Sequence, residues 1–220
     1  VIAWRSFGQD GDGYGVFGRV FSSNGQPQTD EFIINTWTVD DQKDVRLSNL
    51  QGGGFVAVWN SFNQDSPNGN GVFAQQFDLD GEKTGFEIQI NSTSDGEQTY
   101  PDVTCVSSGH CLVAWSGAGN DGDTEIWGQR FNAQFEKLGE EFQLNYFNTG
   151  IQKWPVLAAA PQGGFWSAWF GAGPGDEEGI FLRRFDELGV PLNTEIRVNT
   201  FIEGMQRYPE LAVLPDGSLI

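Results

Sequence analysis

One unit recurs four times along the chain, and this repeat constrains the fold more than any other feature. Trp4, Trp59, Trp115 and Trp169 each end an apolar stretch, and they are separated by 55, 56 and 54 residues. After each tryptophan come a Gly-rich polar stretch and then a segment of paired apolar residues. These segments read "GVFGRVF", "GVFAQQF", "EIWGQRF" and "GIFLRRF". Self-similarity at a nearly constant period indicates a repeat architecture.

The second half of each unit is equally regular. It contains "EFIIN", "EIQIN", "EFQLN" or "EIRVN", and a Gln always follows the Asn by seven residues. A further apolar segment comes after each Gln, then a Gly turn, then the stretch that leads to the next Trp. Four short strands per repeat with alternating apolar positions predict the blade of a β-propeller. No window keeps the 3.6-residue period of a helix. We therefore expect an all-β, four-bladed propeller with four antiparallel strands in each blade.

The two ends of the sequence bear on how the ring closes. The final "LPDGSLI" resembles the start of "QGGGFVAVW" but stops before its Trp, and the chain begins "VIAWRS". We expect the last blade to be closed by both termini, with residues 208–214 beside residues 1–6, which would cover two sheet edges. The alternative is a segment of a longer array. The prediction is one domain, 1–220, with repeats at about 1–55, 56–111, 112–165 and 166–220.

The third repeat shows the motif most fully, as "GNDGDTEIWGQRFNAQFEKLGEEFQLN" at residues 119–145. This run resembles the β-propeller repeats of large secreted bacterial proteins, which have an apolar strand ending in Trp, a DGDG-type loop, an I-x-x-Q-R-F strand and an E-F-x-V-N strand. The resemblance covers the whole chain. It implies a propeller on an extracellular or cell-surface protein, sometimes beside calcium-binding repeats, and it transfers no catalytic residue.

The charge of the chain excludes some partners. A net charge of −18 would repel a phosphate backbone, so we expect no binding of nucleic acid. The sequence has no run of 18 apolar residues and no leader at Val1, so neither membrane insertion nor a signal peptide is expected. The acidity fits binding of cations or, equally well, simple solubility.

Antiparallel order predicts which loops share a face. We name the strands of a blade A to D, strand A being the one after the Gln. The B–C and D–A loops then lie at one end of each blade, which we call the loop face. The B–C loops are acidic and Gly-rich: "GQDGDGYG", "NQDSPNGNG", "GNDGDTE" and "GPGDEEG", the last containing Glu177 and Glu178. Spaced carboxylates of this kind can bind Ca²⁺, although polar turns favour the same residues. The candidate ligands are Asp10, Asp12, Asp65, Asp121, Asp123, Glu125 and Asp176.

Aromatic residues are predicted on the same face. Trp37, Phe147 and Phe201 lie two residues after the recurring Asn, and Tyr14 and Trp154 are expected nearby. Rings beside carboxylates and amides can bind a sugar, whereas the alternative is that they pack between blades. The recurring Asn and Gln residues are interpreted as structural, because residues present in every repeat usually satisfy backbone groups.

Two cysteines flank one short turn. Cys105 and Cys111 bracket "VSSGH", between an A and a B strand. Residues near-opposite in a hairpin can be joined in an oxidising compartment, so the sequence predicts a disulfide.

These features favour a non-enzymatic extracellular recognition or adhesion module that binds a polysaccharide or cell-surface protein through its loop face. One alternative is a calcium-dependent, lectin-like propeller. The other is a glycosidase or lyase that uses two loop carboxylates.

Overall fold

The computed structural model describes residues 1–119 and 122–220. These residues form fifteen strands and no helix. The strands are β1 (Ile2–Phe7), β2 (Tyr14–Arg19), β3 (Phe32–Ile33), β4 (Gln42–Asn49), β5 (Phe55–Phe62), β6 (Asn70–Phe77), β7 (Lys83–Gln89), β8 (Thr99–Cys105), β9 (Cys111–Ala118), β10 (Thr124–Phe131), β11 (Lys137–Gln143), β12 (Gln152–Ala159), β13 (Phe165–Gly173), β14 (Asp176–Phe185) and β15 (Ile196–Arg197).

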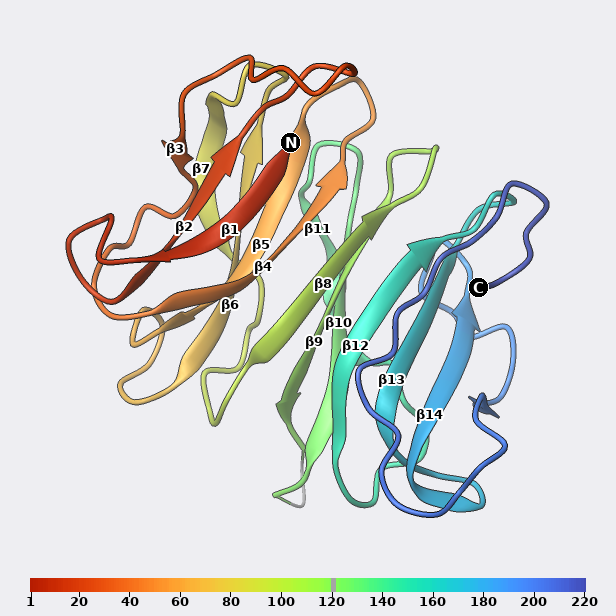
Figure 1. Cartoon of the computed structure of the whole chain (residues 1–220). Coiled ribbons are helices and arrows are strands. Elements are labelled where there is room, and N and C mark those ends of the chain that lie inside the picture. The colour runs from red at the N-terminus through yellow and green to blue at the C-terminus, as the bar shows by residue number, and fades with distance from the viewer. Residues whose placement is uncertain (120–121) are drawn as a thin grey trace. The chain divides into compact units, whose positions relative to one another are not determined.

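Four antiparallel sheets follow the four repeats (Figure 1). Three of them have the predicted order A to D: β4-β5-β6-β7, β8-β9-β10-β11 and β12-β13-β14-β15. The first repeat supplies strands B, C and D as the sheet β1-β2-β3. The all-β, four-bladed propeller architecture expected from the sequence is thus confirmed, with one blade per sheet.

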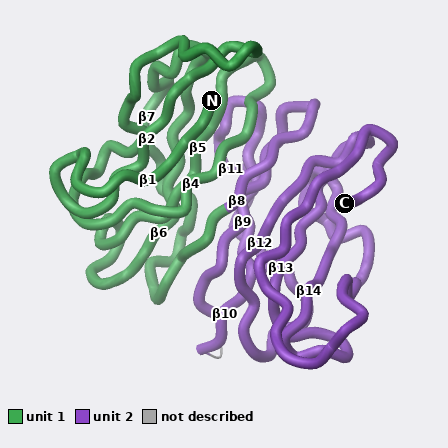
Figure 2. The backbone as a smooth tube through the Cα atoms, viewed as in Figure 1, with its two compact units in different colours: residues 1–101 green, residues 102–220 purple. Residues whose placement is uncertain are grey.

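The chain divides into two compact units, residues 1–101 and 102–220 (Figure 2). In unit 1 the core includes Phe55, Trp59, Phe73 and Phe77 of the second blade, together with Val16 of β2. The Phe55 and Phe77 rings stack with their centroids 4.9 Å apart. These residues recur at alternate positions, so one face of each strand is apolar and can bury itself against the neighbouring sheet.

In unit 2 the core joins the third and fourth blades. Leu112 and Ile126 of the third blade pack with Trp169, Phe181 and Phe185 of the fourth. The repeated tryptophans Trp59, Trp115 and Trp169 are wholly buried, whereas Trp4 on β1 is half-buried. The repeat that is visible in the sequence is therefore mainly a packing repeat.

The predicted closure of the ring is not part of the described strand pairing. Strand β1 pairs with β2 alone. Near the C-terminus, Val213 forms a single bridge with Leu219, within the segment 208–220. Pairing of residues 208–214 with residues 1–6 stays a prediction, as does the single domain 1–220.

A residue with an unusual backbone conformation lies near the start of β4, β8 and β12 and at the equivalent position near the C-terminus. The residue two positions after the recurring Gln has a left-handed conformation in all four repeats: Asp44, Tyr100, Trp154 and Tyr208, with φ between 54° and 58°. The register of pairing shifts at this point in β4 and in β12. Bulky residues rarely adopt such a φ, so these positions are strained.

The predicted disulfide is present. It joins Cys105, at the end of β8, to Cys111, at the start of β9, with an S–S distance of 2.03 Å. The turn that it closes carries His110, whose Nδ1 lies 3.0 Å from Oε2 of Glu187 in the fourth blade. The prediction that these cysteines pair is confirmed.

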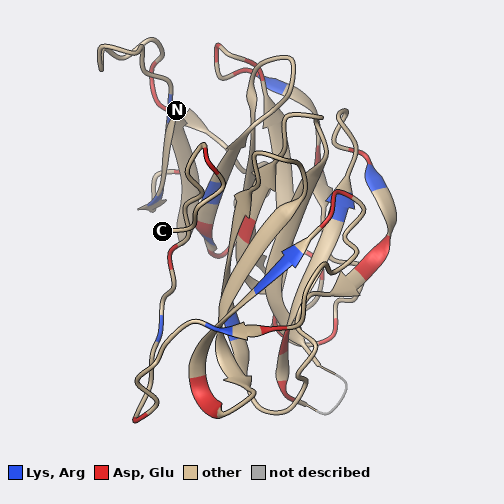
Figure 3. Ribbon diagram, turned by 90° about the vertical axis from the view of Figure 1, so that its right-hand side faces the viewer, with Lys and Arg blue, Asp and Glu red and all other residues tan. Residues whose placement is uncertain are grey.

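Acidic residues are spread over strands and loops (Figure 3). The sequence has 30 Asp and Glu against 12 Lys and Arg. Among the described residues, none belongs to a helix that could cross a membrane.

Candidate functional site

An asparagine at the end of each D strand holds the loop end of its blade together. The Oδ1 atoms of Asn35, Asn91, Asn145 and Asn199 each accept a hydrogen bond from a backbone N–H of strand C, at 2.7–2.8 Å. Each Nδ2 donates to the carbonyl oxygen two residues further along, at 2.8–3.0 Å. The Gln seven residues later donates to other carbonyls of the same D–A loop. The structural interpretation of the recurring Asn and Gln is confirmed.

The same Asn Nδ2 also donates to one carboxylate of the B–C loop in every blade. The acceptors are Asp10, Asp65, Glu125 and Asp176. In the fourth blade the carboxylate packs closely against the strand C backbone, since a Cβ placed on Gly179 would lie 2.7 Å from Oδ2 of Asp176. These four carboxylates anchor the B–C loops to the ends of the D strands.

Two more of the predicted calcium ligands bind backbone groups of a D–A loop. Asp12 Oδ2 accepts from the Asp40 N–H at 3.1 Å, and Asp123 Oδ2 accepts from the Gly150 N–H at 2.9 Å. Asp121 lies outside the described residues. Within residues 1–119 and 122–220, no three His, Cys, Asp or Glu side chains gather so as to hold a metal ion. Calcium binding stays a prediction.

One of the anchoring carboxyls has a shifted titration. Burial raises the pKa of Glu125 above its ordinary value of 4.5, and the charges of Asp123 and Glu195 add to the shift. Hydrogen bonds from Asn145 and Gln143 oppose it. Burial dominates because it penalises the ionised form.

The raised pKa of Glu125 has a consequence for stability. Between 4.5 and its folded-state pKa, the folded protein binds more protons at this site than the unfolded chain, so ionisation of Glu125 lowers stability as the pH rises through that window. We expect Glu125→Gln to flatten this part of the curve of unfolding free energy against pH. Urea unfolding of both proteins at several pH values measures the difference. Parallel curves would show that Glu125 does not titrate in this window.

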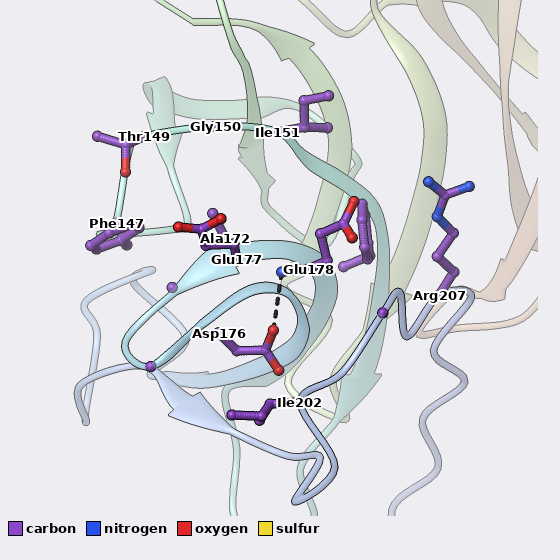
Figure 4. Close-up of a pocket in the computed structure, with 14 residues that line it drawn as sticks. Phe147, Thr149, Gly150, Ile151, Ala172, Asp176, Glu177, Glu178, Ile202 and Arg207 are labelled. Carbon is purple, nitrogen blue, oxygen red and sulfur yellow. Dashed lines mark hydrogen bonds between the residues drawn. The ribbon is translucent and has the colours of Figure 1, made fainter.

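A cavity of about 1000 Å³ lies on the loop face of unit 2 (Figure 4). Its wall comes from three segments that the sequence separates: the D–A loop of the third repeat, the B–C turn of the fourth and the D–A loop of the fourth. In residue numbers, the lining residues fall within 147–151, 170–178 and 202–207. The cavity therefore belongs to the face predicted to bind a ligand.

Three consecutive acidic residues line this cavity, and they differ in their contacts. Asp176 is buried, and its oxygens accept from the Glu178 N–H at 3.1 Å and from Asn199 Nδ2 at 2.7 Å. Glu177 is exposed and Glu178 is half-buried. Figure 4 shows the Glu177 side chain on the Phe147 side of the cavity and the Glu178 side chain on the side nearer Arg207. Asp176 thus fixes the turn, and the next two carboxylates face the cavity.

The predicted aromatic residues fall into two groups. Tyr14 and Trp37 belong to unit 1, whereas Phe147, Phe201 and Trp154 belong to unit 2. Phe147 lines the cavity, and Phe201 precedes the lining residue Ile202. The Trp154 ring packs 5.3 Å from that of Phe170, another lining residue. Of the three in unit 2, Phe147 lines the cavity, and Phe201 and Trp154 lie next to lining residues.

Several lining residues were not singled out from the sequence. Arg207, Ile151 and Phe170 are the main ones. Arg207 directly follows the recurring Gln206 and Ile151 directly precedes Gln152, so the signal that could have found them is their place next to a residue common to all repeats.

The fold is similar to that of several solved structures, although neither a family model nor a curated protein sequence matches the chain. A thermostable family-43 glycoside hydrolase is 12% identical over 94% of this chain and 73% of its own, with a TM-score of 0.55. The endo-arabinase of Bacteroides thetaiotaomicron VPI-5482 is 14% identical over 99% of this chain and 86% of its own, also with a TM-score of 0.55. A protein of unknown function from Dyadobacter fermentans DSM 18053 is 13% identical over 94% and 63%, with a TM-score of 0.62.

The comparison corrects the functional prediction. The chain was expected to be a non-enzymatic recognition or adhesion module and not an enzyme, and the similarity to glycoside hydrolases over at least 94% of its length contradicts both expectations. The error has a physical reason. Acidic loops were interpreted as cation ligands or solvated turns, because the sequence does not reveal that one of them meets two distant D–A loops around a single cavity.

Proposed function

We propose that this protein is a glycosidase that hydrolyses a polysaccharide in the cavity of unit 2. The observation that carries the proposal is a cavity of about 1000 Å³ lined by Asp176, Glu177 and Glu178 in a fold shared with glycoside hydrolases. A volume of this size suits a small-molecule ligand or a few sugar rings. Hydrolysis of a glycoside needs two carboxyl groups, and this wall supplies them.

The contacts of the three acidic residues suggest separate roles. Asp176 already accepts two hydrogen bonds and acts as a positioning residue. Glu177 is exposed, so bulk water can reach it, and it serves as the group that activates the attacking water. Glu178 is half-buried and serves as the acid that protonates the oxygen of the leaving sugar. With the two carboxyls on opposite sides of the bond, cleavage gives a reducing sugar and a shortened chain.

The substrate class and the location follow from the same features. The partner that we propose is a polysaccharide. A disulfide between Cys105 and Cys111 fits an oxidising compartment, so we place the protein outside the cytoplasm, on a secreted or cell-surface parent protein with repeats of the kind described above.

The direct test is hydrolysis by the purified protein. Arabinan, xylan, β-glucan and polygalacturonate are incubated with it, and the release of reducing sugar is measured. Proton NMR of the first product gives the anomeric configuration and therefore distinguishes inverting from retaining hydrolysis. The control is the Glu178→Gln protein purified in the same way, because a contaminating hydrolase would persist in it. If no substrate is cleaved faster than in this control, the proposed function is wrong.

A further inference from the structure

Aromatic rings continue the wall of the cavity beyond its acidic turn. The centroids of the Trp154 and Tyr208 rings are 4.4 Å apart, and Trp154 also packs against Phe170. Arg207 lies over both Trp154 and Phe170, 5.6 Å and 5.3 Å from their centroids. Because Phe170 and Arg207 line the cavity, the Trp154–Tyr208 pair is continuous with it.

The backbone holds this pair beside the acidic turn. The N–H of Gln206, two residues before Tyr208, donates to the backbone oxygen of Glu178 at 3.0 Å. The segment that carries Tyr208 is therefore fixed to the strand that carries the proposed acid.

Most of the Tyr208 side chain is exposed. Its φ is 58°, a left-handed value that is unfavourable for a bulky residue, and its side chain is 70% exposed. Burial of the ring therefore does little to offset the backbone strain. The same φ occurs at Asp44, Tyr100 and Trp154, so the backbone of the repeat sets it, and in the fourth repeat it leaves most of the Tyr208 ring exposed beside Trp154.

The charges around the cavity favour one class of sugar. Asp176, Glu177 and Glu178 line it against a single lining cation, Arg207, whose charge is directed over two aromatic rings. The whole chain has a net charge of −18. A uronic acid chain would be repelled, whereas a neutral sugar would meet no such barrier.

We propose that Tyr208, backed by Trp154, is a stacking subsite for a neutral sugar ring of the polysaccharide. The C–H face of the sugar lies on the tyrosine ring, while the glycosidic bond reaches Glu177 and Glu178. This inference rests on the proposed function, because it names the substrate class and a subsite of the same cavity.

Binding measured without turnover tests the subsite. Pentasaccharides from arabinan, xylan and β-glucan, with pentagalacturonate as the acidic counterpart, are titrated calorimetrically into the Glu178→Gln protein. We expect at least one neutral pentasaccharide to bind and pentagalacturonate not to. Adding Tyr208→Ala should raise Kd about 10-fold, which is about 1.4 kcal/mol. Tyr208→Trp should keep Kd within about 3-fold, because stacking survives. The melting temperature should change little with Tyr208→Ala, because the ring is 70% exposed and its loss leaves no buried cavity.

The control is Phe86→Ala in the same background. Phe86 is 89% exposed on β7 and is absent from the cavity wall, so its loss should leave Kd unchanged. An unaltered Kd in Tyr208→Ala, tighter binding of pentagalacturonate or no binding of any neutral pentasaccharide would each overturn the subsite. Failure of the proposed function differs from failure of the subsite. In that case the wild-type protein would cleave no substrate, but neutral pentasaccharides would still bind and Tyr208→Ala would still weaken their binding.

Discussion

The Glu178→Gln protein is expected to hydrolyse its polysaccharide about 10²–10⁴ times more slowly than the wild type, the range that a general acid contributes. Glutamine matches the size of glutamate but has no proton to give to the departing sugar. The Glu178 side chain has no hydrogen bond or ion pair within the described part of the chain, so the fold should be kept and the melting temperature should not change. Initial rates on the polysaccharide and on aryl glycosides measure the effect.

The leaving group provides an internal check on this role. A dinitrophenyl glycoside needs little protonation, so its hydrolysis should fall much less than that of the polysaccharide. Glu210→Gln is the matched control, because Glu210 is an exposed glutamate of the same unit that is not in the cavity wall. Equal loss on both substrates would contradict the acid role, and full activity of Glu178→Gln would overturn the proposed function.

Trp169→Ala should lower the free energy of unfolding by about 3–5 kcal/mol, the usual cost of truncating a buried aromatic side chain. Trp169 has no exposed surface and packs in the core that joins the third and fourth blades. The change leaves a cavity that rigid β-sheets cannot fill by collapsing. Urea unfolding followed by circular dichroism gives the value.

Trp4→Ala provides the comparison, since Trp4 occupies the same position of the repeat on the edge strand β1. It is half-buried in the described structure, so a smaller loss is expected. A loss as large as that of Trp169→Ala would instead indicate that further residues cover β1, as the predicted ring closure requires. A Trp169→Ala protein as stable as the wild type would contradict the assignment of the repeated Trp to the core.

The sequence predicted the blades well because their signal is local. Alternation of apolar residues within a strand and the recurrence of Trp at one position are enforced by packing inside each blade, so all four sheets could be placed. The disulfide could be predicted equally well, since Cys105 and Cys111 face each other across a turn of five residues.

The site could not be predicted as well, because it depends on contacts between repeats. Glu178 was visible as one acid among many, and nothing in its neighbourhood in the sequence distinguishes it from the anchoring carboxylates Asp10 and Asp65. The distinction is geometric: the anchors receive an Asn amide, and Glu178 does not. Tyr208 has a left-handed φ, which its residue type does not predict, since glycine, asparagine and aspartate are the residues enriched in that conformation.

The left-handed residue two positions after each recurring Gln has a bearing on how such a repeat can diversify. Amides and carboxylates around it are common to the four blades, whereas the residue itself is Asp44, Tyr100, Trp154 or Tyr208. Hydrogen bonds from the recurring Asn and Gln hold the D–A loop just before this residue, so its side chain is not needed to shape the loop. One position per blade can therefore change its chemistry while folding stays the same, and a new specificity can arise by single substitutions rather than by rebuilding a loop.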